Sequence, residues 1–159
     1  MANLLPAAVT ELLAIPHPVS LGPGTPDPAL RSKLAQLVAG LSRECAAGLW
    51  LRFDFLDESH TLSQDPETPN SNFWHAIMHR REPDAANSKY WWRRVGAHPV
   101  LTQLRERATS VGYAFTTPEA FVDFCERVRG AGSAEEATAK RVQQLEWDLL
   151  FAWCIGRDG

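Results

Sequence analysis

The stretch Asn72–Pro99, NFWHAIMHRREPDAANSKYWWRRVGAHP, limits the fold of this chain more than any other, because its helix breakers and caps divide it cleanly. Pro83 disfavours helical geometry in the residue before it, so a helix that opens the stretch must end at Glu82. Asp84 suits the N-cap of a second helix, and Gly96 suits the end of that helix. The stretch therefore predicts two consecutive helices that fold back on each other as a hairpin.

The rest of the chain shows the same alternation of caps, breakers and apolar residues at helical spacing. The other segments expected to be helical are Leu4–Ile15, a segment opened by Asp27 and Pro28, Glu44–Gln64, Pro99–Gly112, a segment opened by Thr117 and Pro118, and Ser133–Ile155. The predicted fold class is all-α, a single-domain antiparallel bundle of seven or eight helices. Residues 1–26 would form an N-terminal helix and a Pro/Gly-rich loop, and residues 27–156 the helical core.

Glu44–Gln64 is expected to be the central helix of the bundle. Its apolar residues form two stripes on opposite sides, which is typical of a helix packed between others. His60 lies on the inward stripe that also contains Leu49, Phe53 and Leu56. An alternative is a strand over Gly48–Phe55, because LWLRFDF alternates apolar and polar residues.

Composition narrows the class of protein. A chain of 159 residues that is 45% hydrophobic and 22% charged is expected to bury one sizeable core. A net charge of −3 argues against binding nucleic acid through bulk electrostatics. Cys45, Cys125 and Cys154 are odd in number and lie among apolar residues, which favours reduced thiols in a cytoplasmic protein. The amino-terminal residues lack a basic region, and apolar runs are too short to cross a bilayer, so neither a signal peptide nor membrane insertion is expected.

Two histidines spaced one helical turn apart, His75 and His79, indicate a metal site on the first helix of the hairpin. Glu82, one turn further along, and His60, on the predicted central helix, are candidates for the remaining ligands of an ion such as Zn²⁺ or Ni²⁺. The zinc protease pattern requires Glu directly after the first His, and this chain has Ala76 there. The alternative is that His75 and His79 face solvent.

A second interpretation is a site for a small anionic ligand on the other helix of the hairpin. Arginine forks suit carboxylate or phosphate, and aromatic walls with a few converging polar groups are typical of ligand sites. If the two faces meet, the imidazoles and this polar stripe line one pocket, in which Arg80 or Arg81 could also contact the anion. The alternative is that the arginines are solvated. The predicted ligand-binding residues are Asn87, Tyr90, Trp91, Arg94 and His98.

Other function classes stay open. Neither a Ser or Cys nucleophile with a nearby base nor a Gly-rich phosphate loop is recognisable. A metal-dependent hydrolase or lyase with Glu82 or Asp57 as base is the enzyme alternative. The third function class is a protein–protein interaction module or homodimer. In that case an exposed apolar patch is expected near Trp147–Ile155.

Two resemblances bear on these alternatives. The phrase D-x2-N-x-K-Y-W-W-R-R resembles one tetratricopeptide or Sel1-type hairpin, but no second copy follows at the period of about 34 residues that such an array needs. The longer segment Gly48–Pro99 resembles a bacterial and fungal family without an assigned activity, through the motif W-H-x3-H-R-R-E-x-D-x2-N-x-K-Y-W. That resemblance implies that one motif set contains His60, His75, His79, Glu82, Asn87, Tyr90 and Arg94.

Overall fold

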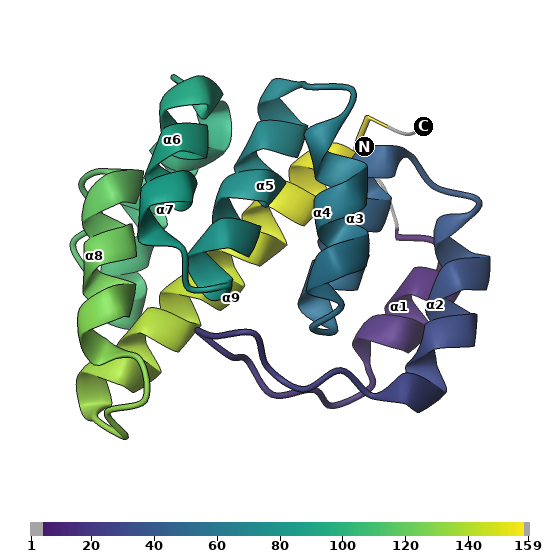
Figure 1. Cartoon of the computed structure of the whole chain (residues 1–159), viewed down its shortest axis with the longest axis horizontal. Helices are drawn as coiled ribbons and strands as arrows, with labels where there is room; N and C mark the ends of the chain where they lie inside the picture. Colours follow the sequence, from purple (N-terminus) through teal and green to yellow (C-terminus); the bar gives the residue numbers. More distant parts are fainter. Residues whose placement is uncertain (1–4, 158–159) are drawn as a thin grey trace.

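The computed structural model describes residues 5–157, which form nine α-helices, two short 3-10 helices and no strand (Figure 1). The all-α class is therefore confirmed, with more helices than the predicted seven or eight. The elements are α1 (Ala7–Leu13), η1 (Pro28–Leu30), α2 (Arg31–Val38), α3 (Arg43–Arg52), α4 (Leu56–Gln64), α5 (Pro69–Arg81), α6 (Ala85–Val95), α7 (Pro99–Arg107), η2 (Ala108–Val111), α8 (Pro118–Val128) and α9 (Ala134–Ile155). Leu4, the first residue of the predicted N-terminal helix, lies outside the described residues.

The predicted single helix Glu44–Gln64 is wrong, because the chain breaks between α3 and α4. Asp54 lies in this break with a φ of 70°, in the left-handed region that Asp tolerates better than most residues. Its carboxylate accepts hydrogen bonds from His17 Nε2 at 2.7 Å, from the Thr25 amide at 3.1 Å and from Arg81. These tertiary bonds hold a conformation that the local sequence does not favour. The alternative of a strand over Gly48–Phe55 is also wrong, since α3 continues to Arg52.

The predicted hairpin is present as α5 and α6. It begins earlier than expected, because Thr68 and Ser71 form a reciprocal capping box and place Asn72 inside the helix. The Asp84 carboxylate caps α6 by accepting from the Asn87 amide, and Gly96 ends that helix with a φ of 66°. The Ser88 hydroxyl closes the hairpin by donating to the Ala76 carbonyl at 2.7 Å.

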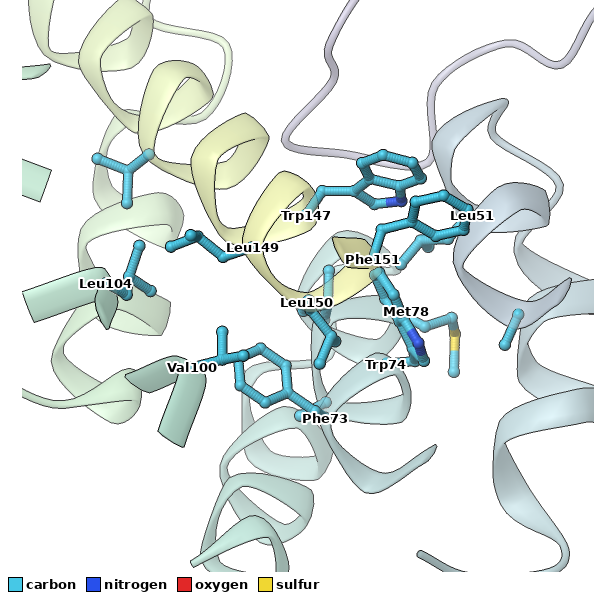
Figure 2. Packing of buried hydrophobic residues seen from close by; sticks show 14 of the residues in the cluster. Leu51, Phe73, Trp74, Met78, Val100, Leu104, Trp147, Leu149, Leu150 and Phe151 are labelled. Atoms are coloured by element: carbon cyan, nitrogen blue, oxygen red, sulfur yellow. The ribbon is translucent and has the colours of Figure 1, made fainter. Parts of the chain in front are cut away.

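The helix α9 runs obliquely across Figure 1, passing behind α5, and packs against α3, α7 and α8. Figure 2 shows Trp147 and Phe151 beside Trp74, with Leu150 nearer Phe73. Trp147 is 7% exposed and Phe151 is 2% exposed within the single chain. The apolar patch expected for a homodimer near Trp147–Ile155 is therefore mostly covered by the chain itself. No helix between residues 5 and 157 has the length and apolar character to span a membrane.

The helix α5 has no solvent-facing side from Ser71 to Arg81. Arg80 donates to the Glu146 carboxylate of α9 at 2.6 and 3.1 Å, and both side chains are 0% exposed. Arg81 donates to Asp54 and to the Leu51 carbonyl at 2.7 Å. The expectation that Arg80 and Arg81 are solvated or bind an external anion is wrong, because both are bound inside the bundle. The contacts of Arg80 and Arg81 hold α5 in one orientation about its own axis.

Candidate metal site

The structure brings together His60 of α4 with His75 and His79 of α5. The ring centroids of His60 and His75 are 4.8 Å apart, those of His60 and His79 are 5.3 Å apart, and those of His75 and His79 are 4.8 Å apart. One ring nitrogen of each residue lies within 4.8 Å of the corresponding nitrogens of the other two. The cluster therefore has the residue types of a three-histidine metal site, with ring nitrogens close enough to be candidate ligands of one ion.

The local sequence accounts for this arrangement. His75 and His79 lie one turn apart on α5, so their imidazoles share a face. The loop of residues 65–68 returns the chain from α4 to α5, and this places His60 opposite that face. His75 and His79 are buried, whereas His60 is partly exposed, so the cluster lies just below the surface.

His75 has an unusual environment for a polar side chain. It is 2% exposed, and neither ring nitrogen has a hydrogen-bond partner among the described residues. Burial, together with the adjacent His79 and His60 rings, lowers the pKa of His75 to about 3. The ring is therefore neutral at physiological pH and keeps a lone pair for a ligand bond. Trp91 stacks on it, with ring centroids 3.9 Å apart and an interplanar angle of 21°.

Glu82 contacts the cluster from its outer side. Its carboxylate accepts a hydrogen bond from His79 Nδ1 at 2.8 Å, which leaves His79 Nε2 available to bind a metal. Metal-bound histidines commonly donate their second nitrogen to such a carboxylate. The geometry thus favours Glu82 as an orienting partner of His79 over the direct ligand that the sequence predicted. His79, Glu82 and Asp84 form a second close group, but the Asp84 carboxylate already accepts from both nitrogens of Asn87.

The predicted ligand-binding residues divide into two groups. Arg94, Tyr90 and Trp91 lie beside the cluster, with the Arg94 guanidinium carbon 5.7 Å from each of the two ring centroids. Arg94 is not free, because it forms a two-point ion pair with Glu67. Asn87 instead binds Asp84 and belongs to the cap of α6.

His98 does not join His75 and His79, and the predicted convergence of these three histidines is wrong. His98 Nδ1 accepts from the Val100 amide at 3.1 Å and so caps α7, while Nε2 donates to Asn70 at 2.7 Å. Its ring packs on Phe73, with centroids 5.2 Å apart. Residues two apart on a helix lie on nearly opposite sides, so Phe73 directs His98 away from the face of His75.

Glu67 and Asn72 also belong to this region, although the sequence pattern does not indicate them. Glu67 lies in the loop before α5, where a single acidic residue gives no signal of its partner. Asn72 opens the predicted hairpin, but in the structure it lies inside α5, is 5% exposed and donates to the Glu67 carboxylate at 3.1 Å. The only indication of this role in the sequence is that Asn72 lies one helical turn before His75.

Comparisons of the chain with models of known families, with curated proteins and with solved structures find no match. The resemblance of the Gly48–Pro99 motif to a bacterial and fungal family therefore stays a prediction. The fold and the cluster define the chain as an all-helical protein with three histidines gathered between consecutive helices.

Proposed function

We propose that this protein binds a divalent transition metal ion, such as Zn²⁺ or Ni²⁺, through His60, His75 and His79. The observation that carries the proposal is the buried His75 imidazole, which stands next to two other imidazoles and has neither nitrogen bonded to any residue between 5 and 157. Buried polar atoms in native proteins are nearly always bonded, and one without a protein partner indicates an ion or a water.

The ligand set suits this class of ion. Imidazole nitrogen is a common ligand of zinc, nickel, copper and cobalt. A tetrahedral ion with Zn–N bonds of 2.0–2.1 Å needs its nitrogens about 3.3 Å apart. The ligand atoms of the cluster lie within 4.8 Å of one another, so metal binding requires the three rings to turn toward a common centre. Three protein ligands leave at least one coordination position open.

Metal titration of untagged protein tests the proposal. After treatment with EDTA and dialysis, the protein is expected to bind about one equivalent of Co²⁺ or Zn²⁺ and to unfold at a higher temperature when loaded, because only the folded state presents all three rings. Substitution His60→Ala removes a partly exposed ligand and is expected to lower the affinity by more than the roughly 10–100-fold typical of losing an outer partner.

The matched control is His98→Asn, which removes another histidine and keeps a side chain able to cap α7. Its metal affinity is expected to equal that of the unmodified protein. Binding of less than a tenth of an equivalent, without a thermal shift, would show that a water molecule rather than an ion satisfies His75.

Glu82 provides a separate test of the site's geometry. Replacement Glu82→Gln is expected to weaken Co²⁺ binding about 10–100-fold, because His79 loses the carboxylate that orients its ring and raises its basicity. The visible absorption bands of the bound Co²⁺ should keep their pattern, since the coordinating atoms stay the same. The exposed carboxylate of Glu106 on α7 gives the control Glu106→Gln. A changed band pattern in Glu82→Gln would instead identify Glu82 as a direct ligand.

A further inference from the structure

Beside the histidine cluster, one carboxylate is held by three donors. Glu67 Oε1 accepts from Arg94 Nε at 2.5 Å and from Asn72 Nδ2 at 3.1 Å, and Oε2 accepts from the second Arg94 nitrogen at 2.8 Å. The hydrogen bond from Arg94 lowers the pKa of Glu67 below its ordinary value, so the carboxylate is ionised. A two-point arginine contact of this kind is the usual way in which proteins recognise a carboxylate.

This carboxylate subsite adjoins the proposed metal site. Trp91 contacts both, because its ring stacks on His75 at 3.9 Å and lies 5.7 Å from the Arg94 guanidinium carbon. Asn72 lies one turn before His75, and its buried Oδ1 has no hydrogen-bond partner in the described part of the chain.

Glu67 is poorly placed to be a permanent structural partner. The side chains of Glu67 and Arg94 are 36% and 44% exposed, and exposed ion pairs of this kind contribute little to stability. A carboxylate from outside could take the place of Glu67 in the Arg94 fork with almost no net change there, because one carboxylate replaces another. The released Glu67 side chain would be solvated.

We propose that the site binds a small dicarboxylate, with one carboxylate in the Arg94 fork in place of Glu67 and the other on the open position of the metal. The inference rests on the metal binding proposed above. Three neutral imidazoles leave the double positive charge of the ion uncompensated, which favours an anionic fourth ligand. A dicarboxylate bound to both the metal and Arg94 has a higher affinity than a ligand bound to either one alone. Trp91 lies against both His75 and Arg94 and forms the apolar wall of the site.

Titration of the Co²⁺-loaded protein with acetate, malonate, succinate and glutarate tests this inference, with the visible absorption of Co²⁺ as the readout. One chain length is expected to bind at least about 10-fold more tightly than acetate, since only that length reaches both anchors. Variant Arg94→Gln is expected to lose this advantage and to bind the same dicarboxylate no better than acetate. Variant Glu67→Gln is expected to bind it more tightly, because the internal competitor is gone.

The matched control is Arg93→Gln, which removes the same charge from the adjacent exposed residue of α6. It is expected to keep the preference for the dicarboxylate, and the Co²⁺ affinity of every variant is measured first. One bound Co²⁺ with equal affinity for acetate and all dicarboxylates, or equal behaviour of Arg94→Gln and Arg93→Gln, would overturn the inference and leave the metal proposal intact. Weaker dicarboxylate binding by Glu67→Gln would overturn the competitor role. A protein that binds no Co²⁺ would overturn the metal proposal itself.

Discussion

Replacement of Arg80 by methionine is expected to lower the free energy of unfolding by about 3–5 kcal/mol, the largest effect of any single substitution considered for this protein. Arg80 and Glu146 are both fully buried, and the guanidinium also donates to Gln143 at 3.2 Å. Removal of the arginine leaves the Glu146 carboxylate in the interior without its opposite charge. Urea unfolding followed by circular dichroism measures the change.

The double variant Arg80→Met with Glu146→Leu separates the ion pair from simple loss of packing. It is expected to recover most of the lost stability, because replacing a whole buried pair with apolar side chains is often neutral or stabilising. The exposed ion pair of Arg94 with Glu67 gives the comparison, and Arg94→Gln should change the unfolding free energy far less than Arg80→Met. An equally small effect of Arg80→Met would contradict the role assigned to this pair in holding α5 against α9.

Asp54→Ala is expected to be the next most damaging change, lowering the free energy of unfolding by about 3 kcal/mol. It removes the carboxylate that neutralises the buried Arg81 and that binds His17 and the Thr25 amide. It also places alanine at a φ of 70°, where a residue other than Gly, Asn or Asp is strained. The approach of the carboxylate is so close that a Cβ on Gly24 would lie 2.3 Å from it.

Asp54→Asn isolates the charge from the backbone, because asparagine tolerates the left-handed conformation and can still accept from Arg81. It is expected to lose less stability than Asp54→Ala. Asp57→Ala removes an exposed carboxylate from the first turn of α4 and serves as the control, with a loss below about 1 kcal/mol. Equal effects of Asp54→Ala and Asp57→Ala in chemical unfolding would show that the Asp54 contacts do not stabilise the bundle.

The helix ends that could be predicted from the sequence are those determined locally. Thr117 caps α8 and Ser133 caps α9 as expected, because a cap involves only a few neighbouring residues. The break at Asp54 could not be predicted, since its causes lie far along the chain at His17 and Arg81.

The site shows the same division between local and distant causes. Helical spacing places His75 and His79 on one face, and the stripe on the predicted central helix placed His60 inward. The spacing of residues along the sequence does not distinguish a solvated arginine from one bound to a distant glutamate. The Arg80–Glu146 pair could therefore not be predicted. The pairing of Glu67 with Arg94 was missed for the same reason. A hydrolase or lyase activity and a homodimer stay predictions.

The enclosure of α5 on all sides affects how the natural variation of this chain should be interpreted. From Ser71 to Arg81, most substitutions would disturb packing or leave a buried charge unpaired, so selection for folding alone would preserve this run of residues in relatives. Its persistence across species would therefore say little about chemistry. The informative positions are the solvent-accessible ones, Glu67, Glu82 and Arg94, where only a functional demand would keep the same side chain.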